Sequence, residues 1–148
     1  ILELGCGLGS LWLINQDRVS KDWDITLSDF SKEMLEETKK NIKDVNHSFN
    51  FQIINTQDIP QKDNTFDVVI SINTVHNLER EECAKALQEI ERVSKGNSYI
   101  TVDAYRNEEE KKRMFDWNLT AKTIMSVDEW VIFFNEIGYT GDYYWFIP

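Results

Sequence analysis

The sequence has few of the residues and runs that mark several broad classes of protein. It contains only two cysteines, Cys6 and Cys83, among 148 residues. One lies in a glycine-rich segment and the other in a helical pattern, so they make neither a disulfide framework nor a zinc site, and no metal site is expected. A reducing, cytoplasmic setting fits this usage best. No apolar run approaches the roughly 20 residues of a membrane-spanning helix, so we expect no membrane partner.

Basic residues are also in the minority. The chain carries 16 Lys and Arg against 26 Asp and Glu, for a formal net charge of −10. An acidic surface repels phosphate backbones, which makes a nucleic-acid partner unlikely. The local basic cluster at residues 111–113 follows a run of glutamates at 108–110, and pairing at helical spacing explains it as a solvated helix face.

Strand-like apolar runs alternate with amphipathic helical stretches along the whole chain. Strands are expected at residues 1–4, 24–29, 49–56, 66–73, 98–105 and 142–148. Helices are expected from about residue 10, and over 31–45, 79–95, 106–123 and 126–138. This alternation predicts an α/β fold, with a doubly wound, mostly parallel sheet and helices on both faces.

The chain is expected to form one domain over residues 1–148. It has no internal repeat, low-complexity tract or linker. The first residue, Ile1, already lies in a predicted strand, so we expect the domain to be truncated at its N-terminus.

The first strand runs into a glycine-rich turn and then a helix. The turn reads Glu3-Leu4-Gly5-Cys6-Gly7-Leu8-Gly9. Glycine lets the backbone turn sharply and approach a ligand closely, and the helix behind the turn offers free N–H groups. A tight turn without a ligand would use the same residues. Dinucleotide enzymes use G-x-G-x-x-G, whereas Ser10 occupies the place of the last glycine here.

The second expected strand ends at Asp29, beside the glycine turn. A carboxylate at this edge of the sheet can accept hydrogen bonds from both ribose hydroxyls of a nucleoside. The alternative is that Asp29 only supplies negative charge at the start of the next helix.

Three segments together resemble the class I, Rossmann-like methyltransferases that depend on S-adenosylmethionine (SAM). The G-x-G-x-G turn follows an acidic residue two positions before its first glycine, as in motif I of that family. The stretch DFSKEML is similar to the family's D-x-S-x-x-M-L, and residues 59–69 are similar to its L-P-F-x-D-N-S-F-D run. The resemblance covers residues 1–142 and implies SAM as cofactor, with S-adenosylhomocysteine as product. It also implies a helical segment before the first strand, which this sequence lacks.

The resemblance further implies which residues contact the cofactor. They are Glu3, Gly5, Cys6, Gly7, Gly9, Asp29, Phe30, Asn55, Thr56, Gln57 and Asn73. The family usually has Asp at the position that faces adenine, and this chain has Asn55. An Asn side-chain oxygen can still accept a hydrogen bond from an adenine amino group. Asp58 is the alternative, although its place before Ile59-Pro60 is typical of a turn.

The methyl acceptor should lie beyond the fourth and fifth strands. His76 is the best candidate for a general base because its ordinary pKa lies near neutrality, and the alternative is that it caps or packs against the following helix. Asp103 and Tyr105 alternate on one strand and could point the same way as further catalytic candidates. The fourth strand ends in SINT and lacks the N/D-P-P-Y/F sequence of amino-methylating DNA enzymes.

The favoured hypothesis is transfer of a methyl group from SAM to a small-molecule acceptor. Two alternatives remain open: a catalytically silent SAM-binding or partner subunit, and a nicotinamide-dependent oxidoreductase on a similar fold. The G-x-G-x-G spacing argues against the oxidoreductase. The aromatic final strand, if exposed as a sheet edge, would allow a homodimer.

Overall fold

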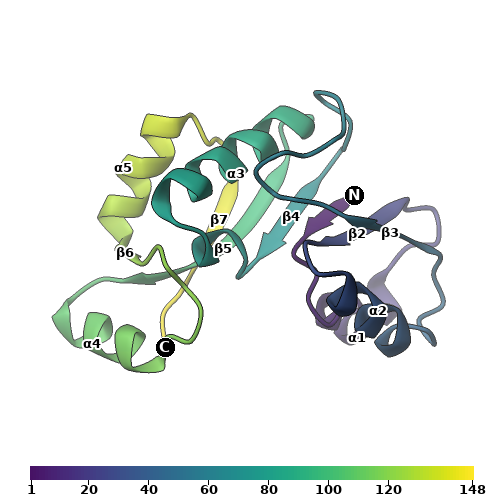
Figure 1. The fold of residues 1–148 in the computed structure, drawn as a ribbon, viewed down its shortest axis with the longest axis horizontal. Coiled ribbons are helices and arrows are strands. Elements are labelled where there is room, and N and C mark those ends of the chain that lie inside the picture. The colour runs from purple at the N-terminus through teal and green to yellow at the C-terminus, as the bar shows by residue number, and fades with distance from the viewer.

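The computed structural model describes all residues 1–148 and contains one seven-stranded sheet (Figure 1). The strands are β1 (Leu2–Leu4), β2 (Ile25–Asp29), β3 (Phe49–Ile53), β4 (Val69–Ile72), β5 (Ser98–Tyr105), β6 (Met125–Ser126) and β7 (Asp142–Phe146). The helices are α1 (Ser10–Ile14), α2 (Lys32–Asn41), α3 (Arg80–Val93), α4 (Glu108–Trp117) and α5 (Val127–Ile137), with short 3₁₀ turns η1 (Gln16–Arg18) and η2 (Val75–Asn77).

Neighbouring strands of the sheet all run parallel, in the order β3-β2-β1-β4-β5. Both β6 and β7 lie beyond β5: β7 pairs with Tyr99–Asp103, and β6 pairs with the last two residues of β5. The direction of winding reverses between β1 and β4, where ligands bind in sheets of this kind. The predicted doubly wound parallel sheet is therefore confirmed.

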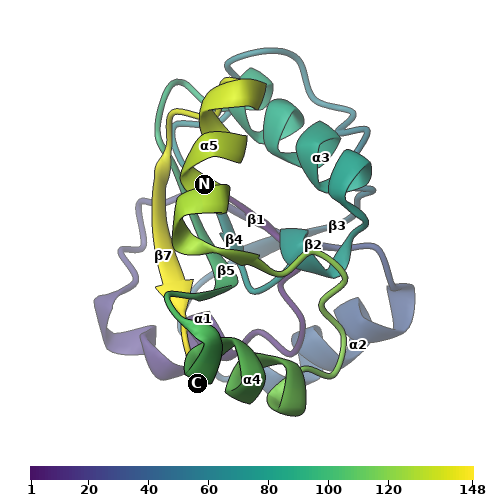
Figure 2. The ribbon, with the colours of Figure 1, turned by 90° about the vertical axis from the view of Figure 1, so that its left-hand side faces the viewer.

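Helices cover the sheet on both faces, as expected. Figures 1 and 2 show α3 and α5 on one side and α1 and α2 on the other. The larger core, of 19 buried residues, lies between the sheet and α3 and α5. A smaller core, of 7 buried residues, lies between β2 and helices α1 and α2. In Figure 1, α4 lies apart from the other helices, beyond the carboxyl end of β5.

The long helices form because cap residues and apolar spacing agree. α3 begins with a capping box between Glu79 and Glu82 and buries Cys83, Leu87 and Ile90 on one face. α5 begins with the predicted capping box at Ser126 and ends at Gly138, whose φ is 75°. A left-handed residue at this position favours glycine and stops the helix.

Several elements differ from the expectations. The helix expected over 106–123 ends at Trp117, because the Asn118 side chain accepts hydrogen bonds from the N–H groups of Thr120 and Ala121 and forms a turn. The third strand, expected to reach residue 56, ends at Ile53 before a second such turn. The two-residue β6 was not predicted.

The outer edge of the sheet is formed by β7. Figure 2 shows this strand running along the margin of the sheet. Tyr143 is 41% exposed and Tyr144 is 60% exposed, and the rings of Tyr143 and Trp145 pack on Phe134 of α5. Cys6 and Cys83 are both buried as free thiols. None of the helices combines the length and the apolar character needed to span a bilayer.

Candidate cofactor site

A cavity of about 500 Å³ lies at the carboxyl ends of β1, β2 and β4. Its volume falls within the range of small-molecule sites. It is lined by Glu3, Gly5, Cys6, Gly7, Ser10, Leu11, Asp29, Phe30, Thr56, Ile72, Asn73, Thr74, Asn77 and Leu78. Most of the cofactor residues expected from the sequence therefore meet at one place, and Gly9, Asn55 and Gln57 lie outside the lining.

The glycine turn serves both packing and access to the cavity. Gly9 has a φ of 76°, and a Cβ at this position would lie 2.8 Å from Ile42 and 2.9 Å from Thr38. It lets α1 pack closely on α2. Gly7 has a φ of 53°, and a Cβ there would meet nothing within 4 Å. Gly7 lines the cavity, so its bare backbone leaves open space on the side where a ligand would lie.

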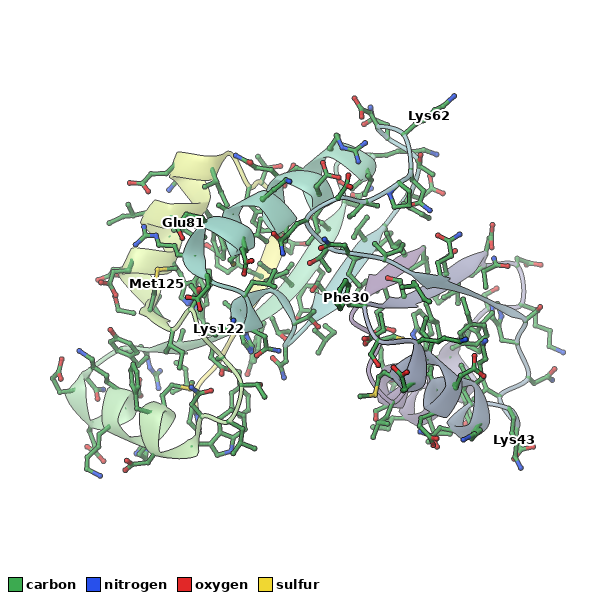
Figure 3. All side chains as sticks on the ribbon, viewed as in Figure 1. Phe30, Lys43, Lys62, Glu81, Lys122 and Met125 are labelled. Atoms are coloured by element: carbon green, nitrogen blue, oxygen red, sulfur yellow. The ribbon has the colours of Figure 1, made fainter.

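Asp29 is held firmly at the end of β2. Its Oδ2 accepts the backbone N–H of Gly7 at 3.2 Å, and its Oδ1 accepts the N–H of Ser31 at 2.9 Å. A carboxylate oxygen has two lone pairs, so each oxygen keeps one for a ligand. The arrangement suits a pair of vicinal hydroxyls. Phe30, labelled in Figure 3, is 75% exposed and lines the cavity beside Asp29.

Glu3 is a buried carboxyl group in the floor of the cavity. The indole N–H of Trp12 donates to its Oε2 and joins α1 to β1. Burial raises the pKa of Glu3 to about 7, against the lowering effect of the Trp12 hydrogen bond, and the nearby charge of Asp29 raises it further. Glu3 therefore lines the cavity and also accepts the hydrogen bond that holds α1 against β1.

The loop after β3 differs in detail from the expectation. The Oδ1 of Asn55 accepts the backbone N–H of Gln57 at 3.0 Å, so this oxygen closes a turn inside the loop. Asp58 also bridges back to Asn55. Thr56 is the residue of this loop that lines the cavity. An adenine contact through the Asn55 side chain would have to share an oxygen that is already engaged.

Two residues of α3 hold this loop in place. Glu89 accepts the backbone N–H of Ile59 at 2.9 Å. Arg92 donates to the carbonyl oxygens of Ile59 and Gln61, each at 2.8 Å, and to the Asp63 carboxylate at 2.9 Å. The paired Glu89 raises the pKa of Arg92, and Asp63 adds to this effect. One planar guanidinium thus connects the loop to the larger core.

Two of the catalytic candidates form a buried pair. His76 Nε2 lies 3.7 Å from Asp103 Oδ2, and the backbone N–H of Asp103 donates to His76 Nδ1 at 3.1 Å. Only 3% of His76 and 2% of Asp103 is exposed. Burial lowers the pKa of His76 to about 4 and raises that of Asp103 to about 6. Neither side chain lines the cavity, so the pair connects η2 to β5 beneath it.

Tyr105, the third catalytic candidate, lies elsewhere. Its hydroxyl donates to Glu129 at 3.5 Å, and Lys111 Nζ lies 5.4 Å from the centre of its ring. The structure therefore does not bring Tyr105 to the His76–Asp103 pair or to the cavity lining.

Several lining residues were not expected from the sequence, namely Ser10, Leu11, Ile72, Thr74, Asn77 and Leu78. Ser10, Ile72 and Thr74 directly adjoin expected residues along the chain, so proximity in sequence could have suggested them. Asn77 and Leu78 reach the cavity because η2 turns back over the end of β4. That turn has no clear sequence signal.

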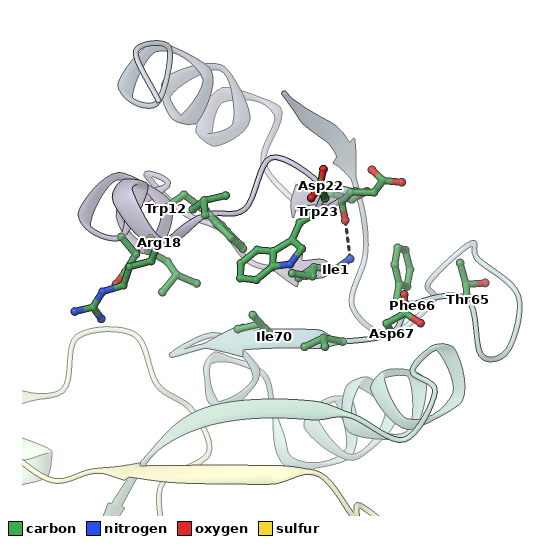
Figure 4. A pocket seen from close by; sticks show the side chains of 15 residues that line it. Ile1, Trp12, Arg18, Asp22, Trp23, Thr65, Phe66, Asp67 and Ile70 are labelled. Carbon is green, nitrogen blue, oxygen red and sulfur yellow. Dashed lines mark hydrogen bonds between the residues drawn. The ribbon is translucent and has the colours of Figure 1, made fainter. Parts of the chain in front are cut away.

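A larger cavity, of about 850 Å³, lies at the opposite ends of the strands (Figure 4). Its walls include Ile1, Trp12, Trp23, Phe66 and Ile70. Ile1 precedes β1, and Phe66 precedes β4. Because ligands of open α/β sheets bind at the carboxyl ends of the strands, we take the smaller cavity as the candidate cofactor site. No group of three or more His, Cys, Asp or Glu side chains comes together as a metal site.

Comparisons with known proteins indicate a methyltransferase family. A family model described as "Methyltransferase domain" matches residues 1–97. The demethylmenaquinone methyltransferase of Symbiobacterium thermophilum is 30% identical over 138 residues, covering 89% of this chain and 53% of that protein. The 2-phytyl-1,4-naphtoquinone methyltransferase of Nostoc is 30% identical over 131 residues, covering 86% of this chain and 56% of that protein. The chain thus spans about half the length of these curated relatives.

A solved structure from Methanococcus maripaludis, described as a candidate SAM-dependent methyltransferase, superimposes with a TM-score of 0.65. It is 26% identical, and the match covers 92% of this chain and 65% of that one. The family match includes the glycine turn, Asp29 and β4. This chain therefore belongs to the class I, Rossmann-like methyltransferase domain family.

Proposed function

We propose that this domain binds SAM in the smaller cavity and supports transfer of its methyl group to a small-molecule acceptor. The observation that carries the proposal is the position of Asp29. Its carboxylate stands at the end of β2, is joined to the glycine turn by the Gly7 N–H, and keeps one lone pair free on each oxygen. These free lone pairs suit the two hydroxyls of a ribose.

The charge of the cavity also fits this cofactor. Its lining contains two carboxyl groups, Glu3 and Asp29, and no Lys, Arg or His. SAM has a positively charged sulfonium and ammonium group and only one carboxylate, so acidic walls favour it. A nicotinamide dinucleotide has a pyrophosphate instead, which would meet these carboxylates without a basic partner. The lining therefore favours SAM over the dinucleotide alternative.

The residues of the chain would act by holding and orienting the reactants. When bound, SAM supplies a methyl group that is already activated by the sulfonium charge. Asp29 would accept the ribose hydroxyls, and the Thr56 loop would lie against the base. Positioning of two reactants can supply a large part of a rate enhancement, even where no group removes a proton.

The burial of His76 changes its proposed role. Because His76 and Asp103 are both enclosed and do not line the cavity, we assign them to positioning of η2, whose Asn77 lines the cavity together with the following Leu78. The acceptor would then lose its proton to solvent or to a group outside this domain. The same observation favours the catalytically silent alternative, because no side chain of the lining is an accessible neutral base.

Two of the curated relatives are quinone methyltransferases, which supports a small-molecule acceptor. The test is to incubate the protein with methyl-labelled SAM and a reduced naphthoquinone, and to measure labelled product together with S-adenosylhomocysteine. We expect both to form, and both to be lost with Asp29→Ala. Binding of SAM without either product, for this acceptor and for a panel of phenols and amines, would support the silent alternative.

Two further proposals concern the setting of the domain. The two buried free thiols fit a reducing, cytoplasmic compartment. The open edge of β7 would allow a homodimer in which two such strands pair. Light scattering on the protein and on Tyr144→Lys measures this directly: we expect a dimer for the parent and a monomer for the variant.

A further inference from the structure

Asn73, directly after β4, adopts a left-handed backbone conformation. Its φ is 50°, and Asn64 is the other non-glycine residue with a positive φ. A residue other than glycine stays in this region only where its surroundings hold it, and such residues gather at functional sites. Asn73 also lines the cavity. The contacts that hold it therefore bear on what the cavity binds.

Thr101, in the neighbouring strand β5, makes a reciprocal pair of hydrogen bonds with Asn73. The backbone N–H of Asn73 donates to Thr101 Oγ1 at 2.8 Å, and Thr101 Oγ1 donates to Asn73 Oδ1 at 2.7 Å. The carbonyl oxygen of Asn73 accepts from the Asn77 amide at 3.2 Å. Thr101 thus holds the backbone N–H and the side-chain oxygen of Asn73, and Asn77 holds its carbonyl oxygen.

This pairing decides which way the Asn73 amide faces. A threonine hydroxyl has one hydrogen, and Oγ1 already accepts the backbone N–H, so its hydrogen is free to donate. The atom that receives it must be an acceptor, which is Oδ1 and not Nδ2. The Nδ2 group consequently points away from Thr101. It has two N–H donors, and neither has a partner in the protein.

The strand order shows what would meet these donors. β2, β1 and β4 are consecutive in the sheet, so a ligand that is anchored at Asp29 and passes over the glycine turn next reaches Asn73. In SAM, the part beyond the ribose is the methionine moiety with its single carboxylate. Because the lining has no basic side chain, neutral N–H donors are the groups available to that carboxylate.

We propose that Thr101 is a positioning residue that locks Asn73, so that the Asn73 amide donates a hydrogen bond to the α-carboxylate of the cofactor. The proposal rests on the proposed function and adds to it. Thr101 is 8% exposed and would act only through Asn73. Asn73 is the residue that would touch the cofactor.

The test compares two ligands that differ in the moiety in question. S-adenosylhomocysteine has the amino-acid carboxylate, whereas 5′-methylthioadenosine has the adenine, the ribose and a methylthio group but no amino acid. Both are titrated by calorimetry into the parent protein, Thr101→Val, Thr101→Ser and Asn73→Gly. We expect Thr101→Val and Asn73→Gly to weaken S-adenosylhomocysteine binding about tenfold or more, the effect of losing a hydrogen bond to a charged group. Binding of 5′-methylthioadenosine should stay within about twofold, and Thr101→Ser should behave as the parent.

Thermal unfolding accompanies each titration. Asn73→Gly should unfold near the parent temperature, because glycine adopts a positive φ without strain, which offsets the loss of the bond from Thr101. A loss of affinity in this variant is then not a loss of fold. Equal weakening of both ligands, or no change for either, would overturn the role of Thr101 and Asn73 while leaving the cofactor assignment intact. A parent protein that binds neither ligand would overturn the proposed function, and this inference with it.

Discussion

The Asp29 carboxylate and the Gly7 backbone N–H are joined by a hydrogen bond of 3.2 Å between Oδ2 and N. The bond connects the end of β2 to the turn after β1, so two segments that are 22 residues apart form one wall of the cavity. The carboxylate is therefore oriented before any ligand arrives. A preorganised group loses little conformational freedom on binding, which is favourable for affinity.

Replacing Asp29 with Ala should weaken SAM binding by about 1.5–3 kcal/mol, or roughly tenfold to a hundredfold in dissociation constant. The reason is the loss of charged acceptors for the ribose, together with a freer glycine turn. Calorimetric titration measures the effect. Asp24→Ala is the matched control, because Asp24 is exposed just before the start of the same strand and does not line the smaller cavity. An Asp29→Ala protein that is folded and binds as tightly as the Asp24→Ala control would exclude the ribose role.

Alanine at Gly7 and at Gly9 should have different consequences. Both residues have positive φ, so each substitution should cost about 1–2 kcal/mol of folding stability. Gly9→Ala should cost more, because its Cβ would approach Ile42 and Thr38 below 3.0 Å. Gly7→Ala should instead reduce affinity for the cofactor, since its Cβ enters the open side of the cavity. Urea denaturation and SAM titration on both variants separate the two effects, and identical behaviour would contradict this division.

Arg92→Lys should loosen the loop that carries Thr56. A lysine ammonium cannot reproduce the planar set of bonds to the carbonyls of Ile59 and Gln61 and to Asp63. We expect a several-fold loss of affinity for 5′-methylthioadenosine, which has the base and ribose but no amino acid. Hydrogen exchange should increase at residues 57–63. Arg80→Lys on the same helix is the control, because Arg80 makes one exposed ion pair with Glu136. Equal effects of the two variants would show that the loop does not depend on Arg92.

The His76–Asp103 pair should give opposing pH dependences of stability. The pKa of His76 is lowered from 6.5 to about 4, so the unfolded state binds more protons in that window, and stability falls as the pH drops. The pKa of Asp103 is raised from 3.8 to about 6, so the folded state binds more protons there, and its contribution grows as the pH drops. In the parent protein the two contributions partly cancel.

Asp103→Asn should therefore lose stability more steeply than the parent between pH 6.5 and 4, and His76→Gln less steeply. Urea denaturation at several pH values across this range measures both slopes. Parallel curves for the three proteins would mean that these groups do not titrate within the folded state as described.

The features that could be predicted from the sequence are those set by local chemistry. A strand followed by closely spaced glycines and a helix predicts a tight turn of the backbone, and the turn lies where it was expected. Asp29 was predictable because a parallel strand places its last residue at the ligand-binding edge. Periodicity likewise indicated α3, and periodicity with capping indicated α5, whose Ser126 and Glu129 form the expected capping box.

The features that could not be predicted depend on contacts between distant segments. His76 is enclosed because the loop after α4 donates the N–H groups of Lys122 and Thr123 to its carbonyl, which no local pattern reveals. Asn55 could not be assigned, because the use of its oxygen in a turn depends on the conformation of the loop. The side-chain pairing of Thr101 with Asn73 follows only from the alignment of β4 with β5.

The central claim is that the smaller cavity is a site for SAM. The most direct measurement is a calorimetric titration of the protein with SAM, S-adenosylhomocysteine and NAD under one set of conditions. We expect binding of SAM and of S-adenosylhomocysteine with one site per chain, and no measurable heat with NAD. Binding of NAD without binding of SAM would contradict the claim.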